Sequence, residues 1–419
     1  MMNLHEMGKR ARSASIKLAG STSQQRAEVL NRLADRLLSN TDEILKSNAR
    51  DYQNALRAGL SEAMLDRLLL TSSRLQSMSE DLKRVANLPD PLAEIFEEQV
   101  LPNGLRLHKR RVPLGVLGVI YESRPNVTVD VAGLAMKSGN AVILRGGSET
   151  VETNRTLVHC IQEVLVETGL PEACVQWIED TDRRYVLELL QMDEFVDLII
   201  PRGGASLHEF CRKNSRIPVI TGGIGICHLF VEESADLEKA LPVILNAKVQ
   251  RPTVCNALDT LLVQRSIASQ FLPEVVRVLG EAGVSFRVDQ EAWNILRDHP
   301  TGDVVLAQPG DFDTEWLSLV LGIRVVDNFE EAIQHIEQHS TGHSDGILTQ
   351  NTELAETFIR RVDSAAVYVN ASTRFTDGGQ FGLGAEVAIS TQRIHARGPM
   401  GLKELTTYKW VVEGAYHVR

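Results

Sequence analysis

The stretch Val116-Leu-Gly-Val-Ile-Tyr121 is continuously apolar and β-favouring, which predicts a buried strand. A helical pattern follows over residues 127–137 and leads to a second buried strand, Ala141-Val-Ile-Leu144. Parallel strands need a crossover connection, so this strand–helix–strand order predicts a doubly wound α/β fold. Sheets of that kind bind ligands beyond the carboxyl ends of their strands.

The alternation extends over most of the chain and predicts two α/β domains, with Cys255 near their junction. Further strands are predicted at residues 175–178, 196–200, 218–221, 227–231, 258–263, 304–307, 324–326 and 347–349, and further helices at 152–167, 267–282 and 329–338. The residues before Pro89 predict helices. Residues 98–101 and 105–112 predict two strands joined by a hairpin turn, because Asn103-Gly104 lies between them.

Composition limits the class of protein. The chain has 419 residues, of which 43% are apolar, and a net charge of -11, which makes nucleic acid or an anionic membrane an improbable partner. No apolar run approaches membrane-spanning length, and charged residues near the N-terminus interrupt any signal-peptide pattern. Five cysteines without framework spacing indicate a reduced compartment, so we expect a cytoplasmic protein.

One cysteine differs from the other four. Cys255 lies in the polar segment Gln250-Arg-Pro-Thr-Val-Cys-Asn256, with Arg251 and Lys248 nearby, and cations favour the nucleophilic thiolate. The alternative is a structural, inert thiol. The remaining cysteines fall on apolar helical or strand patterns and are expected to be buried: Cys160, Cys174, Cys211 and Cys227.

Glycine-rich or polar loops follow four predicted strands of the first α/β domain, at residues 123–126, 145–148, 201–206 and 221–225. Such turns let backbone N–H groups approach phosphate, although each one alone is equally compatible with a simple turn. The segment 339–345 contains two histidines, but Gly342 would break the helix that a metal-binding pair needs, so no metal is expected. Residues 374–384 predict either a mobile surface loop or a substrate-closing loop.

Long motifs carry a family resemblance over essentially the whole chain. They occupy residues 112–126, 134–148, 250–256, 339–345 and 368–386, the last reading Tyr-Val-Asn-Ala-Ser-Thr-Arg-Phe-Thr-Asp-Gly-Gly-Gln-Phe-Gly-Leu-Gly-Ala-Glu. With these motifs the chain resembles the aldehyde dehydrogenase superfamily, and within it the γ-glutamyl phosphate reductase (glutamate-5-semialdehyde dehydrogenase) family. The resemblance implies NADPH-dependent reduction of L-glutamate 5-phosphate to L-glutamate 5-semialdehyde with release of phosphate, the second step of proline biosynthesis.

The resemblance also implies roles for individual residues. Cys255 would attack the acyl phosphate and form a thioester, and the Asn126 amide would hold the developing oxyanion. The positions matching the family's cofactor contacts are Arg145, Ser148, Gly203, Gly204, Ser206 and Glu315. The positions expected to bind substrate are Arg124, Arg251, Asn370, Ser372, Thr373 and Arg374, of which Arg124 and Arg251 are phosphate candidates.

One departure from the family pattern bears on the chemistry. Hydrolysing relatives carry a glutamate at the position of Thr221, where it activates water, and a threonine cannot act as that base near neutral pH. This favours phosphate as the acyl partner over a hydrolytic NAD(P)-dependent aldehyde dehydrogenase. A nucleotide-binding module with an inert Cys255 is the other alternative, and selective alkylation of that thiol would discriminate.

The resemblance assigns a role to each domain. Residues 1–96 and 116–223 would bind NADP, and residues 224–395 would carry the catalytic cysteine. Residues 97–115 and 396–419 would form a β-hairpin oligomerisation arm, whose alternative is a hairpin packed on its own domain. We therefore expect a homo-oligomer, dimer or tetramer, and a possible transient complex with a separate glutamate 5-kinase, because the chain has no room for a kinase domain.

Overall fold

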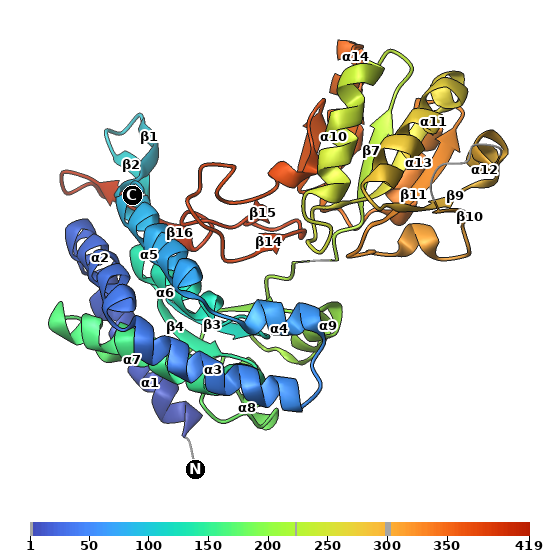
Figure 1. Cartoon of the computed structure of the whole chain (residues 1–419). Helices are drawn as coiled ribbons and strands as arrows, with labels where there is room; N and C mark the ends of the chain where they lie inside the picture. Colours follow the sequence, from blue (N-terminus) through green and yellow to red (C-terminus); the bar gives the residue numbers. More distant parts are fainter. Residues whose placement is uncertain (1–2, 223, 298–302) are drawn as a thin grey trace. The chain divides into compact units, whose positions relative to one another are not determined.

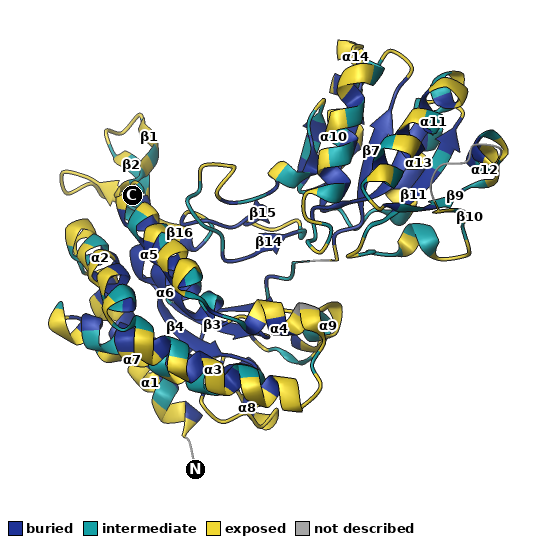
Figure 2. Ribbon diagram, viewed as in Figure 1, coloured by how far each residue is buried: buried dark blue, intermediate teal, exposed yellow. Residues whose placement is uncertain are grey.

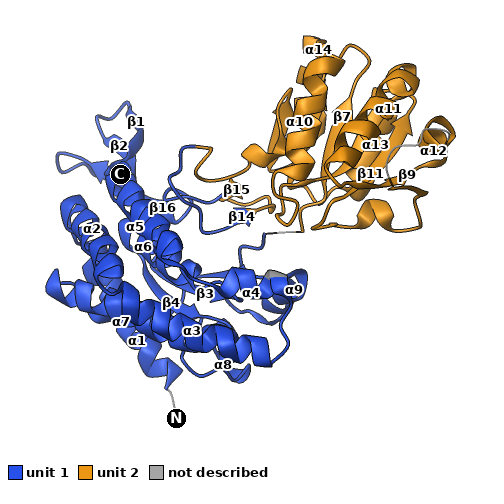
Figure 3. Cartoon of the chain, viewed as in Figure 1, with its two compact units in different colours: residues 1–222, 382–389, 399–419 blue, residues 223–381, 390–398 orange. Residues whose placement is uncertain are grey.

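The computed structural model describes residues 3–222, 224–297 and 303–419. Contacts divide the chain into two compact units, which Figure 3 colours separately. Unit 1 comprises residues 1–222, 382–389 and 399–419, and unit 2 comprises residues 223–381 and 390–398. Both units contain a parallel sheet flanked by helices, which confirms the predicted α/β fold class.

Unit 1 contains an N-terminal run of helices followed by a strand–helix alternation (Figure 1). Its helices are α1 (Leu4–Ala19), α2 (Ser23–Ser39), α3 (Thr41–Arg57), α4 (Glu62–Leu68), α5 (Ser72–Asn87), α6 (Asn126–Lys137), α7 (Val151–Glu167), α8 (Arg184–Leu190) and α9 (Ala205–Asn214). Its longer strands are β1 (Ile95–Val100), β2 (Arg106–Pro113), β3 (Val116–Tyr121), β4 (Ala141–Arg145), β5 (Val175–Trp177), β6 (Leu198–Arg202) and β16 (Thr406–Glu413). Short 3-10 turns lie at Pro91–Ala93, Ser148–Thr150 and Glu172–Cys174.

The main sheet of unit 1 is parallel and has the order β5-β4-β3-β6. Every residue of β3 and β4 is buried, which explains their continuous apolar sequence. Because the strands are parallel, their carboxyl ends meet at one edge. The loops that follow β3, β4 and β6 leave this edge, and they contain the polar residues expected to bind ligands.

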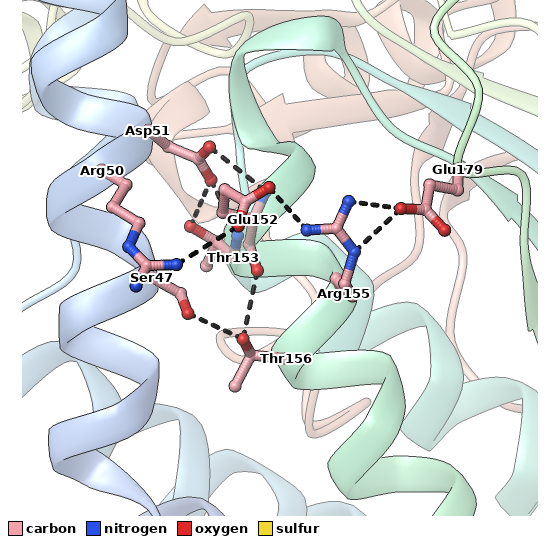
Figure 4. Close-up of polar contacts among 8 residues, drawn as sticks. All are labelled: Ser47, Arg50, Asp51, Glu152, Thr153, Arg155, Thr156 and Glu179. Carbon is pink, nitrogen blue, oxygen red and sulfur yellow. Dashed lines mark hydrogen bonds and ion pairs between the residues drawn. The ribbon is translucent and has the colours of Figure 1, made fainter.

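A polar network fixes the start of α7, just after one of these loops (Figure 4). Asp51 of α3 accepts hydrogen bonds from the backbone N–H groups of Glu152 at 3.2 Å and Thr153 at 2.8 Å. Those N–H groups have no partner within their own helix, so Asp51 caps it from outside. A second contact between the two helices joins the Ser47 and Thr156 hydroxyls at 2.8 Å. The loop at residues 146–150 therefore ends on a fixed helix.

The predicted hairpin forms a separate antiparallel sheet of order β1-β2-β16. Gly104 has φ of +89° in its turn, a conformation that favours glycine. The C-terminal strand β16 pairs with β2 over its whole length, so Tyr408 lies opposite Arg111. Most residues of β16 are exposed, and Trp410 keeps 50% of its surface accessible.

Unit 2 alternates strands and helices from its beginning. Its strands are β7 (Cys227–Val231), β8 (Leu258–Gln264), β9 (Ser285–Val288), β10 (Asp303–Leu306), β11 (Val320–Val326), β12 (Ser344–Leu348) and β13 (Ala366–Val369). Its helices are α10 (Leu237–Val249), α11 (Arg265–Glu281), α12 (Gln290–Leu296), α13 (Phe329–His339) and α14 (Thr352–Arg361), with 3-10 turns at Asp311–Asp313 and Thr373–Phe375. Two short strands, β14 (Ile389–Ser390) and β15 (Gly398–Pro399), pair with each other, and each has one residue in either unit's range.

All strands of the large sheet in unit 2 run parallel, in the order β10-β9-β11-β8-β7-β12-β13. Its central strands are buried on both faces, as Figure 2 shows by their dark colour between partly exposed helices. Apolar side chains such as Leu261 and Phe286 form the core between sheet and helices. Within the described residues, no helix is long and apolar enough to cross a membrane.

One predicted strand is wrong. Residues 218–221 make only a single parallel bridge, between Val219 and Ile199. Proline at position 218 has no N–H to donate, so the pairing uses only its carbonyl group and the Ile220 N–H. The chain leaves the sheet directly afterwards, and Gly223 of the predicted glycine loop lies outside the described residues.

Candidate active site

Cys255 lies in a turn between α10 and β8, at the amino edge of the unit 2 sheet. It is partly exposed, whereas the other four cysteines, all described, are buried, as predicted. Burial raises the pKa of the Cys174 thiol to about 12 and that of Cys211 to about 11. Cys255 is therefore the thiol that a substrate can reach.

The neighbouring residue Asn256 anchors this turn. Its buried side chain donates from Nδ2 to the Thr376 carbonyl oxygen at 2.8 Å. Its own carbonyl oxygen accepts a hydrogen bond from Thr373 Oγ1 at 2.7 Å. The cysteine turn is thus joined at two points to the segment that follows β13.

A second segment packs against Cys255 from the loop before β7. Gly225 lies so close that a Cβ atom placed on it would be 1.6 Å from the Cys255 carbonyl oxygen, so only glycine fits there. The Gly225 N–H donates to Glu315 Oε1 at 2.9 Å. Burial raises the pKa of the Glu315 carboxyl group. Cys255, Gly225 and Glu315 therefore belong to one connected group.

Two arginines contribute positive charge near this turn. Burial, and next the charge of Arg251, lower the pKa of the Arg374 guanidinium, whose charge also interacts with Cys255. Arg374 Nε is buried and has no hydrogen-bond partner among the described residues. The Asp377 carboxylate partly offsets the repulsion between these two cations, and an anionic ligand would offset it further. The pair therefore suits an anionic ligand.

The other expected substrate residues have structural contacts of their own. The Asn370 amide donates to the Thr349 carbonyl oxygen at 2.8 Å and accepts from the Thr349 N–H at 2.9 Å. Ser372 Oγ accepts from the Arg374 N–H at 3.3 Å, and the Thr373 hydroxyl is committed to the cysteine turn. These three residues shape the segment in which Arg374 lies.

In unit 1, Asn126 is the first residue of α6, after the loop at residues 122–125 that follows β3. Its Nδ2 donates to Asp130 Oδ2, one helical turn later, at 2.9 Å. Arg124, two residues earlier, is exposed. Asp130 is not among the site residues predicted from the sequence, although an asparagine and an aspartate four residues apart on a helix are a recognisable interacting pair.

Among the cofactor candidates, Arg145 points into the protein. Its guanidinium donates to the carbonyl oxygens of Gly146 at 2.6 Å and Thr181 at 2.7 Å, and it is 8% exposed. It therefore joins the loop after β4 to the loop after β5. Ser148 is exposed, and the neighbouring Glu149 carboxylate accepts from the Ser123 N–H and hydroxyl at 2.5 Å each.

Gly203, Gly204 and Ser206 are exposed in the loop after β6 and the first turn of α9. A helix N-terminus with accessible N–H groups suits a phosphate ligand. A Cβ on Gly203 would lie 2.3 Å from a Glu122 carboxylate oxygen, whereas the position of a Cβ on Gly204 is open. Glu122, which the sequence analysis missed, accepts from the Gly204 N–H at 3.1 Å.

The histidine segment at residues 339–345 has a structural role. Asp345 is fully buried and accepts from the His228 N–H at 2.9 Å, from His228 Nδ1 at 3.0 Å and from Ser340 Oγ at 2.6 Å. His343 is buried beside Ser344. In the described part of the chain, no group of three or more His, Cys, Asp or Glu side chains is arranged to hold a metal ion.

A sequence model of the aldehyde dehydrogenase family matches residues 2–291 and 312–411, nearly the whole chain. The chain belongs to the aldehyde dehydrogenase family. This confirms the resemblance of the sequence motifs to the aldehyde dehydrogenase superfamily. Full-length relatives confirm the resemblance to γ-glutamyl phosphate reductases. The chain is 56% identical to the γ-glutamyl phosphate reductase of Psychromonas ingrahamii and 55% identical to that of Pasteurella multocida; each alignment covers all of this chain and at least 99% of the relative.

Solved structures of aldehyde dehydrogenase family members agree with this assignment. The γ-glutamyl phosphate reductase of Thermotoga maritima is 49% identical, with a TM-score of 0.97 over the full length of both chains. An acetylating aldehyde dehydrogenase from Geobacillus thermoglucosidasius shares 18% identity and a TM-score of 0.69, covering 99% of this chain and 97% of that one, which shows the fold alone. These relatives make the chain an oxidoreductase of this family, and Cys255 is its partly exposed thiol.

Proposed function

We propose that this family member reduces γ-glutamyl phosphate to glutamate 5-semialdehyde with NADPH, releasing phosphate through a thioester on Cys255. The observation that carries the proposal is the charge beside that thiol. Arg374 and Arg251 interact electrostatically, and a buried Arg374 N–H lacks a partner among the described residues. An acyl phosphate that also carries an α-carboxylate brings the anions that this pair suits.

In the proposed reaction, the Cys255 thiolate attacks the acyl carbon, a C–S bond forms, and the negative charge moves to the carbonyl oxygen. Asn126 Nδ2 and the Cys255 backbone N–H are the donors proposed for that oxygen. The C–O bond to phosphate then breaks, and phosphate leaves with the bonding electrons. Arg374 holds the α-carboxylate and Arg251 the phosphate. Arg124 is a further phosphate candidate.

The residues of unit 1 fit a dinucleotide. The exposed first turn of α9, with Gly203, Gly204 and Ser206, would hold its pyrophosphate, and Glu122 would have to release the Gly204 N–H. Exposed Ser148 is neutral, and Glu149 is bonded to Ser123, so neither presents a free carboxylate against a ribose 2′-phosphate. Arg145 holds the surrounding loops, and Glu315 would bind the nicotinamide ribose. When bound, NADPH supplies the hydride.

Hydrolysis of the thioester is disfavoured by the side chain at position 221. The threonine there offers no carboxylate to activate water. A thioester that resists water survives until it is reduced, which a reductase requires. Phosphate, rather than water, is therefore the proposed acyl partner in both directions of the reaction.

The test runs the reaction backwards with purified protein, following NADPH formation from glutamate semialdehyde and NADP with and without phosphate. Strict dependence on phosphate, lost in Cys255→Ala, is the expected result. Turnover without phosphate would mean that water accepts the acyl group and would refute the proposal. NAD in place of NADP, at matched concentrations, is expected to give slower turnover, and equal rates would refute the cofactor preference.

The same proposal covers assembly and location. The β1-β2-β16 sheet carries exposed Trp410, Tyr408 and Val412, which suit pairing with a second copy as an oligomerisation arm in a dimer or tetramer. If light scattering finds only monomer, the assignment of this sheet as an oligomerisation arm is refuted. A cytoplasmic enzyme that receives a labile acyl phosphate would gain from a transient complex with glutamate 5-kinase, which co-sedimentation of the two proteins would reveal.

A further inference from the structure

Asp130 contacts the amide that the proposed function assigns to the oxyanion. Asn126 and Asp130 lie one turn apart on α6, and Asn126 Nδ2 donates to Asp130 Oδ2 at 2.9 Å in a partly buried setting. An ionised carboxylate has acceptors but no donor, so it can be paired only with the NH2 side of an amide. The carboxylate therefore determines which way the Asn126 amide faces.

We propose that Asp130 is a positioning residue for the reaction: its carboxylate fixes the Asn126 amide so that the second N–H of Nδ2 remains available to the oxyanion. This inference rests on the proposed function, since it assumes that Asn126 stabilises the oxyanion. The alternative orientation would present the amide oxygen, whose negative partial charge would repel the developing oxyanion. A neutral partner at position 130 would no longer exclude that orientation.

Other hydrogen bonds already hold the backbone of this helical turn, so only the orientation of the Asn126 amide remains to be fixed. Thr128 Oγ1 is within 2.6 Å of the Tyr121 hydroxyl and donates to Asn154 Oδ1 at 2.7 Å, and Asn154 in turn donates to Thr150 Oγ1 at 2.9 Å. These buried bonds hold the first turn of α6 against β3 and α7. The backbone of Asn126 is thus positioned by packing, whereas its side-chain orientation depends on Asp130.

Burial of the Asp130 carboxyl group makes its contact with Asn126 sensitive to pH. Burial raises the pKa of the Asp130 carboxyl group to about 6, while the Asn126 hydrogen bond and the Arg202 charge oppose that rise. Above about pH 6 the carboxylate is ionised and accepts from Asn126. Below it the group is protonated, can donate to the amide oxygen, and no longer enforces one orientation. We therefore expect an additional decrease in activity as the pH falls through about 6.

Asp130→Asn keeps the shape and removes the charge, which makes it the test variant. We expect kcat to fall about 10-fold to 100-fold with little change in KM for either substrate, less than the roughly 10²–10³-fold typical of deleting an oxyanion donor. The extra acid loss near pH 6 should disappear. The matched control is Glu80→Gln on α5, because Gln76 Nε2 donates to Glu80 Oε1 at 2.9 Å in the same four-residue arrangement on an exposed surface. That control should leave kcat unchanged.

A double-mutant cycle decides between positioning and mere structural support. If Asp130 acts through Asn126, then Asp130→Asn should cost nothing further in an Asn126→Ala background. Additive losses, an unchanged kcat in Asp130→Asn, or an unchanged acid limb would each overturn the inference. Asp130→Ser, a smaller neutral side chain, takes the place of Asp130→Asn if thermal unfolding shows that the latter does not fold.

The failures can be told apart. A wild-type protein without phosphate-dependent turnover overturns the proposed function, and this inference with it. A wild-type protein with that turnover, in which Asn126→Ala is nearly neutral, overturns only the role of Asn126 and Asp130. Alkylation of Cys255 by iodoacetamide should proceed at the wild-type rate in the Asp130→Asn variant, because the inference leaves the thiol itself unaltered.

Discussion

Replacing Gly225 by alanine tests whether the cysteine turn is held as closely as the structure indicates. The added Cβ would lie 1.6 Å from the Cys255 carbonyl oxygen and 2.9 Å from its Cα, whereas side-chain Cβ contacts stay beyond 3.0 Å. The obstacle is backbone, which cannot rotate aside. The two segments must therefore separate by about 1.4 Å, the difference between 3.0 and 1.6 Å.

That displacement predicts the size of the effect. A reacting group misplaced by about 1 Å can lose about 10²-fold in rate. Forced overpacking costs roughly 1–3 kcal/mol of unfolding free energy. We therefore expect Gly225→Ala to lower kcat at least about 100-fold. The KM for cofactor should also rise, since the Gly225 N–H orients Glu315.

The assay measures kcat for phosphate-dependent semialdehyde oxidation, the rate of Cys255 alkylation and the Tm of each variant. Gly20→Ala is the control, because Gly20 has φ of −83° and its added Cβ would have its nearest contact at an ordinary 3.5 Å. That variant should match the wild type. A Gly225→Ala protein with wild-type kcat and Tm would refute the close packing of this turn.

Three further predictions test the site and the fold. Because the Cys227 thiol is buried, Cys227→Ala should keep selective alkylation and most of the turnover. Cys255→Ala should lose both the alkylation and the turnover. Loss of alkylation in Cys227→Ala would contradict the prediction. Arg374→Ala should raise the KM for glutamate semialdehyde about 10-fold to 100-fold, because a charge-assisted hydrogen bond is lost. The control Arg360→Ala, at an exposed position, should leave that KM unchanged. Equal KM values in the two variants would refute the assignment of Arg374 to the α-carboxylate. Asp51→Ala should lower Tm by about 2–8 °C as the α7 cap is lost, and an unchanged Tm in a thermal melt would contradict the capping role.

Buried parallel strands were predictable because their physical signature is local. Residues 116–121 form β3 with the predicted limits, since a strand covered on both faces must be continuously apolar. The failure at residues 218–221 has an equally local cause: Pro218 satisfies the apolar pattern but cannot donate a ladder hydrogen bond. An apolar pattern predicts burial, whereas the length of a strand depends on which backbone N–H groups are available to pair.

The directions of polar side chains are not encoded so locally. Arg145 ends β4, at the sheet edge where a cofactor contact is expected, yet its guanidinium binds the carbonyl oxygens of Gly146 and Thr181. Thr181 belongs to a loop 36 residues further along the chain, so its position depends on how β4 and β5 pair. Asp130 could have been paired with Asn126 by helical spacing, but only the contact gives that spacing a role.

Burial by itself distinguishes Cys255, the proposed nucleophile, from the other four thiols. Withdrawing a thiol from water raises its pKa and also blocks its access to substrate. The packing that builds the two cores therefore leaves the four buried cysteines unreactive. Cys227 is the instructive case: its Sγ donates to the Cys255 carbonyl oxygen at 3.2 Å, yet it is fully buried and its pKa is raised. Proximity to the site is therefore insufficient. A reactive thiol here requires a partly exposed position, and among the five cysteines only Cys255, in the turn between α10 and β8, has one.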